Sequence, residues 1–369
     1  MQQYKVCHIT SVHTRYDIRI FVKECISLIK NNFSVSLIVA DSKGNESNNG
    51  VSIFDVGKTS GRFSRIFYTT KQIYRKVLEL NPDIVHFHDP ELMLVGVKLS
   101  KLGYKVIYDV HEDLPKQVMS KSWIPNYIRP IISKIVTYIE KLCSSKFTGI
   151  IAATSIIANR FNKYNNNVRV IHNYPLLSEM ANTNTNWDKR DSSLCYIGSI
   201  SKTRGIEPLI MSLEMSKLKL ELAGIFSDDL SITRLSKLPG YQYVNYNGIL
   251  NRQEVAELLS KVKVGIVTLL PTLSYVESLP IKLFEYMLAG IPVIASDFKL
   301  WREIIMSHKC GILVNPKDSN EVASACELLL NDQSLAKQMG ENGRRAVLEH
   351  YNWEVECVYL VDFYNKIYE

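Results

Sequence analysis

The feature that most constrains this chain is the regular alternation of short apolar runs with segments of helical periodicity. Runs rich in Val and Ile, such as residues 34–40 (SVSLIVA) and 149–154 (GIIAAT), alternate with stretches such as 20–30 and 91–102, where apolar residues recur every three or four positions. Strands buried on both faces of a parallel sheet have this composition, and the helices between them are crossover connections. We therefore expect an α/β fold of doubly wound parallel sheets.

The alternation runs twice along the 369 residues, with one interruption. Residues 176–193 are rich in Asn, Thr, Ser and charged side chains, the composition of a linker. We expect a Rossmann-like domain over 1–175, a second over 194–350, and a cleft between them. A C-terminal helix over 351–369 is a candidate to cross back to the first domain. The candidate strands are 5–10, 34–40, 83–88, 105–110 and 149–154 in the first half, and 193–201, 218–224, 241–248, 262–269, 290–296 and 310–316 in the second.

Composition limits the location and the class of the protein. The sequence has neither an N-terminal signal segment nor a run of ~20 apolar residues. Its seven cysteines are scattered and never form a C-x-x-C pair, so we expect neither a disulfide framework nor a structural zinc site built on cysteines. These features predict a cytoplasmic protein with reduced thiols.

The net charge of +7 is divided unevenly. Residues 1–175 carry +11 and residues 176–369 carry −4. Two stretches, 57–77 and 116–146, each interleave six Lys or Arg with aromatic residues at roughly helical spacing. Basic amphipathic helices bind anionic bilayers without spanning them, so we expect the first domain to associate peripherally with the inner face of the cytoplasmic membrane. A solvated basic face is the alternative, and no nucleic-acid-binding motif is present.

Residues 277–296, ESLPIKLFEYMLAGIPVIAS, set two glutamates around the start of a predicted helix. Pro280 suits the first helical position, and Gly290 ends the helix. Free amides and a partial positive charge at a helix N-terminus attract phosphate, and Glu285 is placed to accept both hydroxyls of a ribose. The alternative is that Glu277 complements the helix dipole while Glu285 pairs with Lys282. The candidate phosphate donors are the amides of Ser278, Leu279, Ile281 and Lys282.

A second segment favours a diphosphate site. Residues 196–210, YIGSISKTRGIEPLI, read as a strand, a polar loop with Lys202 and Arg204, and a helix that begins after Gly205. A strand, a basic loop and a helix start form a phosphate site at the carboxyl edge of a parallel sheet.

Together these motifs resemble the family 4 retaining glycosyltransferases of the GT-B fold. The likeness includes the E-x7-E pair Glu277 and Glu285, the continuation over 285–296, the basic loop and the tail over 310–353. It implies two Rossmann-like domains facing across a cleft, and transfer of a sugar from a nucleotide-sugar donor to a glycan acceptor with retained configuration. Bacterial relatives use lipid-linked acceptors in polysaccharide biosynthesis, such as that of O-antigen, capsule or exopolysaccharide. No metal or other cofactor is expected.

The resemblance assigns roles to residues of the second domain. It implies that Glu285 holds the donor ribose, that Glu277 contacts the transferred sugar, and that Arg204 neutralises the diphosphate. The chain departs from the family pattern at Ser199, where many members carry arginine, and in SLP after Glu277, where many carry glycines. We expect Lys282 to supply the missing positive charge. The predicted donor-binding residues are Ser199, Lys202, Arg204, Ser278, Leu279, Lys282 and Glu285.

The first domain carries polar residues at its strand ends. His111, in VIYDVHEDLP, matches a family histidine that reaches the transferred sugar, and we predict it and Glu277 as the catalytic residues. Asp17 is an alternative base. The predicted acceptor-side residues are His13, Asp17, Arg19, His88 and Asn173.

Three other functions remain open at this point. His86, His88 and His111, with neighbouring acids, could assemble a metal site for hydrolysis. A sugar-nucleotide epimerase, or a non-catalytic nucleotide-sugar-binding protein, would use the same scaffold without an acceptor. His86 and His88 lie on one face of a strand, so they could equally be core histidines.

Overall fold

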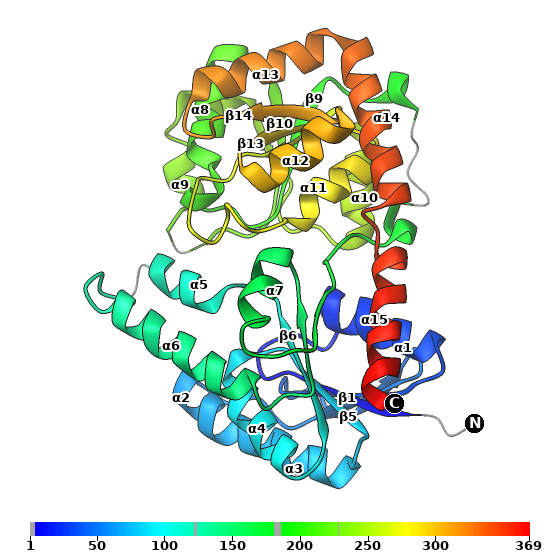
Figure 1. Ribbon diagram of the computed structural model, residues 1–369. Coiled ribbons are helices and arrows are strands. Elements are labelled where there is room, and N and C mark those ends of the chain that lie inside the picture. Colours follow the sequence, from blue (N-terminus) through cyan, green and yellow to red (C-terminus); the bar gives the residue numbers. More distant parts are fainter. Residues whose placement is uncertain (1–3, 122–123, 181–185, 228) are drawn as a thin grey trace. The chain divides into compact units, whose positions relative to one another are not determined.

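The computed structural model describes residues 4–121, 124–180, 186–227 and 229–369 (Figure 1). The chain forms two compact units, Met1–Asn173 with Val355–Glu369, and Tyr174–Glu354. Each unit is built around its own parallel sheet, as expected for a doubly wound α/β chain. Among the described residues, no helix combines the length and the apolar character that a membrane crossing requires.

The first unit is centred on an eight-stranded sheet in the order β3-β4-β2-β1-β5-β6-β7-β8. Neighbouring strands are parallel except at the edge, where β3 runs antiparallel to β4. The chain builds outward from β1 on one side and resumes at β5 on the other, so β1 and β5 flank the topological switch point. The strands are β1 (Lys5–Ile9), β2 (Ser34–Val39), β3 (Glu46–Asn48), β4 (Val51–Asp55), β5 (Ile84–Phe87), β6 (Lys105–Val110), β7 (Gly149–Ala152) and β8 (Val168–Val170).

Helices connect these strands and cover the sheet. The interior strands β5 and β7 are buried along their whole length, which explains their largely apolar sequences. The connections are η1 (Ile18–Cys25), α1 (Ile26–Lys30), α2 (Arg62–Ser64), η2 (Arg65–Thr69), α3 (Thr70–Leu80), η3 (Pro90–Leu92), α4 (Met93–Lys101), α5 (Leu114–Ser120), α6 (Arg129–Ser144) and α7 (Ser155–Phe161), and the last helix of the chain is α15 (Trp353–Tyr368). Two of these segments, η1 and η2, are π-helices, a rare form that is frequent at functional sites.

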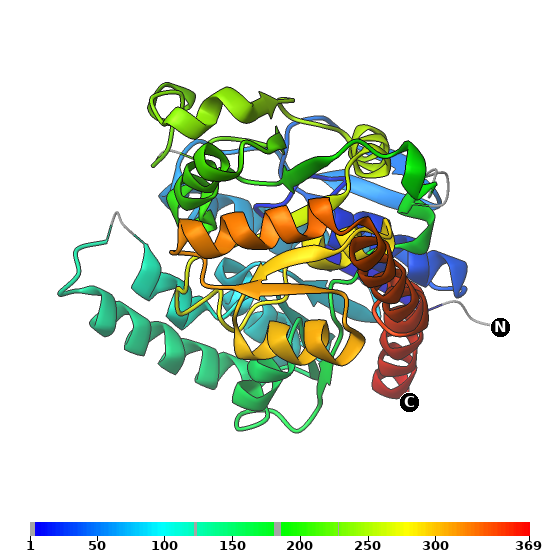
Figure 2. The same cartoon turned by 90° about the horizontal axis from the view of Figure 1, so that it is seen from above.

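The second unit contains a six-stranded sheet in the order β11-β10-β9-β12-β13-β14. This is the Rossmann order 3-2-1-4-5-6, with its switch point between β9 and β12. Helices α12 and α13 lie on opposite faces of β13 and β14 (Figure 2). The strands are β9 (Ser193–Ile197), β10 (Lys219–Ala223), β11 (Val244–Tyr246), β12 (Val264–Val267), β13 (Val293–Ser296) and β14 (Gly311–Val314). The helices are η4 (Leu177–Met180), η5 (Trp187–Lys189), η6 (Lys202–Arg204), α8 (Ile206–Ser216), α9 (Ile232–Leu235), η7 (Pro239–Tyr243), α10 (Arg252–Lys261), α11 (Ile281–Leu288), α12 (Lys299–His308), α13 (Ser319–Asn331) and α14 (Gln333–Glu349).

The predicted fold class is confirmed, and each of the eleven candidate strands overlaps a strand of the structure. The sequence patterns missed β3, β4 and β8. These are short strands in the outer parts of the first sheet, and β3 and β8 have no fully buried residue. A strand at an edge lacks the strong apolar signal of a central strand because part of its surface stays in water.

The segment expected to be a linker, 176–193, belongs to the second unit in its described part, and residues 181–185 lie outside the described residues. Trp187 is buried, and the guanidinium of Arg190 donates to the carbonyl oxygens of Leu259, Val262 and Ala289. The polar composition of the segment concealed this packing.

Candidate functional site

The switch point of the second sheet is built on a close approach of two loops. Strands β9 and β12 are neighbours, and the loops that follow them meet at Gly205. Gly205 has φ +72°, and a Cβ atom there would lie 1.9 Å from the carbonyl oxygen of Thr268. Only glycine fits this backbone conformation and this approach. The basic loop of residues 198–205 therefore lies directly beside the loop that leads to α11.

Basic side chains converge at this point. Lys202 and Arg204 form the short helix η6 and are half-buried, whereas Ser199 is exposed. The Arg204 guanidinium lies 5.1 Å from the centre of the Tyr275 ring, which comes from the loop before α11. This cation–π contact joins the two loops that sequence reasoning identified separately.

Lys282 lies buried at the start of α11. Its Nζ atom is 3.7 Å from the centre of the Tyr196 ring, and it has no hydrogen-bond partner among the described residues. Burial and the neighbouring Arg204 charge lower the pKa of Lys282 well below its usual range. Nζ lies 3.1 Å from the position that a Cβ atom would take at Gly198, so the absence of a side chain at Gly198 leaves room for it. An anion at this position would restore the charged state of the lysine.

Helix α11 carries the second glutamate of the predicted pair. The helix begins at Ile281, so Pro280 is its N-cap and not its first residue as expected. Glu285 is 4% exposed, and its Oε1 accepts a 2.7 Å bond from Arg252. The side chain of Glu285 thus pairs with Arg252, and not with Lys282 as the alternative prediction had it. Arg252 also donates to Glu179 at 2.6 Å, so two carboxylates share one guanidinium.

The loop before α11 is held by its own hydrogen bonds. The Ser278 amide and hydroxyl both donate to the Tyr275 carbonyl, at 3.2 and 3.1 Å. The Ser278 carbonyl accepts a 2.7 Å bond from the Trp301 indole. The Ser278 amide, predicted as a phosphate donor, is thus engaged inside the loop, and Glu277 and Leu279 beside it are partly exposed.

The carboxyl edge of the first sheet carries a second polar group. Asp89, after β5, accepts 2.7 Å bonds from the Thr10 hydroxyl and the Ser11 amide, which follow β1. His13 lies between two carboxylates, with Nδ1 3.2 Å from Asp17 and Nε2 3.4 Å from Asp89. These residues flank the switch point of the first sheet.

The pKa values of His13 and Asp17 move in opposite directions. The hydrogen bond to Asp17 raises the pKa of His13. Burial opposes ionisation of Asp17, but bonds from His13 and from the Ile20 amide outweigh it and lower the pKa of that carboxyl. Asp17 also caps η1 by accepting from the amides of Arg19 and Ile20. Asp17 therefore has two roles, since it stabilises the start of η1 as an N-cap and pairs electrostatically with His13.

His111 lies at the same edge, above a buried carboxylate. Its Nε2 is 3.1 Å from Asp109, whose two oxygens accept 2.9 and 2.8 Å bonds from Arg19. Burial lowers the pKa of His111 to about 3, although the charge of Asp109 acts to raise it. The imidazole is therefore neutral at physiological pH. Arg19 and His88 are 3% and 2% exposed and lie beneath this edge, where His88 bonds Asp109 at 3.2 Å. Asn173 accepts a 2.7 Å bond from Lys23.

Sequence reasoning missed several members of these groups. Arg252 and Glu179 are brought to Glu285 from distant parts of the chain, and no local pattern marks them. Glu24 was also missed, since it lies next to Lys23 in a segment that has further basic residues, and nothing local marks it. Its side chain is fully buried.

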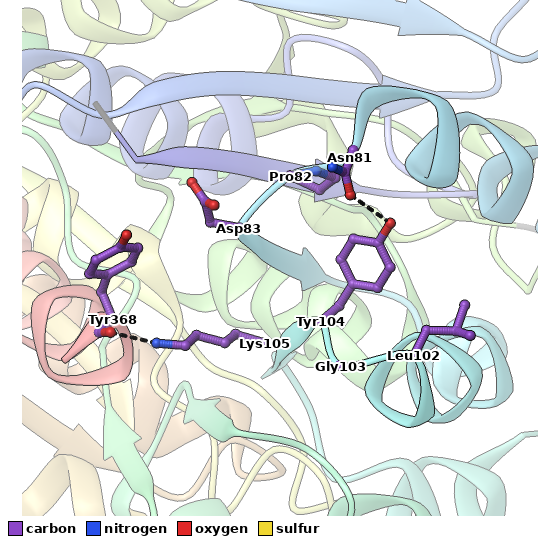
Figure 3. Close-up of a pocket in the computed structure, with 8 residues that line it drawn as sticks. All are labelled: Asn81, Pro82, Asp83, Leu102, Gly103, Tyr104, Lys105 and Tyr368. Carbon is purple, nitrogen blue, oxygen red and sulfur yellow. Dashed lines mark hydrogen bonds between the residues drawn. The ribbon is translucent and has the colours of Figure 1, made fainter. Parts of the chain in front are cut away.

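A surface hollow lies elsewhere on the first unit (Figure 3). It is lined by the residues before β5 and β6 and by Tyr368, with Lys105 donating to the Tyr368 carbonyl. No predicted site residue lines it. Ligands of doubly wound sheets bind at the carboxyl ends of the strands, and this hollow lies at the amino ends.

Comparison with known proteins follows the same division of the chain. Residues 19–174 match the family model described as Glycosyltransferase Family 4, and residues 179–346 match that of Glycosyl transferases group 1. The uncharacterized glycosyltransferase MJ1607 of Methanocaldococcus jannaschii is 23% identical, over 89% of this chain and 88% of its own. The O-antigen chain mannosyltransferase C of Escherichia coli is 21% identical, over 78% of this chain and 75% of its own.

A likeness to a solved structure agrees with these matches. The Anabaena protein HepE, solved in complex with UDP-glucose, superposes with a TM-score of 0.75 at 11% identity, over 98% of this chain and 99% of its own. The two parallel-sheet units have the GT-B fold of glycosyltransferases. Within that class, the two family models identify the chain as a family 4-like glycosyltransferase.

Proposed function

We propose that this glycosyltransferase moves a hexose from a nucleoside-diphosphate sugar to a glycan acceptor with retention of configuration. The observation that carries the proposal is the contact of the two loops at the second switch point, where Arg204 stacks on Tyr275 beside the buried Lys282. A diphosphate is the ligand that would match this concentration of positive charge. The transfer step uses no metal in this proposal, because Arg204, Lys202 and Lys282 supply the compensating charge.

The remaining contacts are proposed for residues at the carboxyl edges of both sheets. Glu285, fixed by Arg252, accepts the ribose hydroxyls, and Glu277 in the adjoining loop contacts the transferred sugar. The neutral imidazole of His111 binds a hydroxyl of that sugar and orients it for departure of the diphosphate. His13 and Asp17 contact the acceptor. Arg19 and His88 contribute to the acceptor side indirectly, through their hydrogen bonds to Asp109. Asn173 contributes through its hydrogen bond from Lys23.

The proposed acceptor is lipid-linked, and the proposed pathway is bacterial polysaccharide synthesis on the cytoplasmic side of the membrane. The name of the Escherichia coli relative, an O-antigen chain mannosyltransferase, supports this pathway. Helix α6 supports a membrane-facing surface, since four apolar side chains on one face are at least half exposed. They are Ile131, Ile135, Tyr138 and Leu142, and Lys134 and Lys141 are exposed beside them. An amphipathic basic helix of this kind lies in the plane of an anionic bilayer.

Donor binding is tested by a thermal-shift screen with UDP-, GDP- and ADP-sugars. We expect one nucleotide series to raise the melting temperature, and EDTA added with the nucleotide to leave that increment unchanged. Glu285→Gln should reduce the increment strongly, whereas Glu303→Gln, an exposed glutamate on α12, should keep it. Absence of any shift, or an increment that Glu285→Gln retains, would overturn the assignment of the donor site.

Membrane binding is tested by co-sedimentation with phosphatidylglycerol and phosphatidylcholine vesicles. We expect binding only to the anionic vesicles, and its loss in Ile131→Ser/Ile135→Ser. Leu328→Ser removes a leucine of similar exposure from α13 in the second unit and should bind like the wild type. Binding that does not depend on lipid charge contradicts the proposed surface.

A further inference from the structure

Four potential metal ligands meet inside the first unit, directly beneath the carboxyl edge of its sheet. His8 on β1 and His86 on β5 are paired in register on neighbouring strands, and His88 follows β5 directly. Glu24, on the π-helix η1, faces them. The side chains of all four are 0% exposed.

Their ligand atoms are spaced as a small cation requires. His8 Nδ1 lies 3.0 Å from His88 Nε2. Glu24 Oε2 lies 3.8, 3.7 and 3.9 Å from His8 Nδ1, His86 Nδ1 and His88 Nε2. Four ligands held at about 2.0–2.1 Å in a tetrahedron lie roughly 3.3 Å from one another, so these four distances need to change by about 0.3–0.6 Å. All the ligand atoms of the group lie within 4.8 Å of one another.

The carboxylate of Glu24 is fully buried, with one ion-pair partner and no hydrogen bond within the described part of the chain. Neither of its oxygens has a hydrogen-bond partner among the described residues, although Arg19 Nε lies 3.2 Å from Oε1. Burial and the neighbouring Asp109 charge raise the pKa of Glu24 well above its usual range, so its ionised form is costly, and a coordinated metal ion would offset that cost in place of a proton. The carboxylate oxygens lie next to three imidazoles, the commonest metal ligands in proteins.

A second layer of side chains supports the histidines. His88 bonds Asp109 through Nδ1, at 3.2 Å, which leaves Nε2 for the site. His8 Nε2 lies 3.3 Å from the Tyr364 hydroxyl, which leaves Nδ1. The same hydroxyl bonds His86 Nδ1 at 2.6 Å. Metal binding by His86 Nδ1 therefore requires the hydroxyl to break this bond while it keeps its contact with His8. Carboxylate and hydroxyl partners of this kind fix the tautomer and the orientation of metal-bound histidines.

We propose that His8, His86, His88 and Glu24 bind a divalent transition-metal ion of the zinc type. The ligand set of three nitrogens and one oxygen suits zinc, and full burial with four protein ligands is the arrangement of a structural site and not of a hydrolytic one. The ion joins β1, β5 and η1 beneath the edge that carries His13 and His111. In this proposal the ion contacts neither donor nor acceptor, and it departs from the sequence-based expectation of a protein without metal.

The test is the metal content of the protein, expressed in zinc-supplemented medium and purified without a metal-affinity step. We expect one zinc per chain in the wild type, and a fall in metal affinity of about 10- to 100-fold or more in Glu24→Gln. Glu140→Gln changes another buried carboxylate of the first unit, one paired with Arg160, and should keep the zinc. A folded wild-type protein that contains no metal and takes up none on addition of Zn²⁺ would overturn the proposal.

Cobalt substitution keeps the test decisive if Glu24→Gln fails to fold. Wild-type protein loaded with Co²⁺ should show the visible absorption of a tetrahedral nitrogen and oxygen site, and added Zn²⁺ should abolish it. An octahedral spectrum would assign the cobalt to the surface and contradict the site. Nucleotide-induced stabilisation is measured separately, so failure of the metal site and failure of the donor site are distinguishable.

Discussion

Arg252 holds Glu285 by a 2.7 Å bond at the point where α10 faces α11, and shares its guanidinium with Glu179. Arg252 therefore fixes the orientation of the carboxylate proposed to bind the donor ribose. We expect Arg252→Gln to weaken binding of the nucleoside diphosphate about 10-fold or more, because hydrogen bonds to charged groups contribute about 1.5–3 kcal/mol.

A double-mutant cycle measured by calorimetry checks this coupling. If Arg252 acts through Glu285, the double variant Arg252→Gln/Glu285→Gln should bind no more weakly than Glu285→Gln alone. Arg234→Gln removes an exposed arginine paired with Glu207 in the same unit and serves as the control. Additive losses in the cycle would show that the two residues act independently.

Features that depend on neighbouring residues in the sequence were predictable, and features that depend on contacts between distant residues were not. All six strands of the second sheet overlap a predicted strand, and the clearest of them, β9, β12 and β13, are buried runs bounded by turn residues. The pair Glu277 and Glu285 was visible because both residues lie near one helix start. The partner of Glu285 was not, since Arg252 comes from a different helix, 33 positions away, and nothing local distinguishes it from a solvated arginine.

The first unit shows the same difference between local and long-range features. His86 and His88 were visible as alternating residues of one strand, and their interpretation as core histidines was left open. The structure buries both and adds His8 and Glu24, which depend on strand register and on the π-helix. Register between distant strands cannot be obtained from a single local pattern.

Gly205 should be far less tolerant of alanine than another glycine of similar backbone conformation. Gly248 has φ +70° and no atom within 4 Å of its would-be Cβ, so Gly248→Ala pays only for the left-handed conformation, roughly 1–2 kcal/mol. Gly205→Ala adds the overlap with the Thr268 carbonyl, and we expect a cost of roughly 3 kcal/mol or more, with loss of donor binding. Tryptophan fluorescence in urea measures this, since Trp187, Trp301 and Trp353 all belong to the second unit. Equal losses in both variants would contradict a close-packed switch point.

The ion pair of His13 and Asp17 should give the first unit a pH-dependent stability. The folded-state pKa of His13 is raised, so the stabilisation is fully present below the unfolded value near 6.5 and is lost as pH rises through the folded value. His13→Gln should therefore reduce the decline of melting temperature between about pH 5.5 and 8.5. His350→Gln, an exposed histidine of the second unit, should retain the wild-type curve. Parallel curves for wild type and His13→Gln would show that the pair contributes nothing to folding.

Lys282→Met should stabilise the free protein and impair its function. Because burial lowers the folded-state pKa of Lys282, the unfolded chain binds more protons over the interval between the two pKa values. Stability then rises with pH through that interval, and at neutral pH the buried lysine is a cost that methionine, of similar length, removes. The same change deletes a cation of the proposed diphosphate site. We expect a higher melting temperature without nucleotide, a smaller increment with it, and a lower kcat/KM. A Lys282→Met variant that is more stable and equally active would place the diphosphate away from α11, on Lys202 and Arg204 alone.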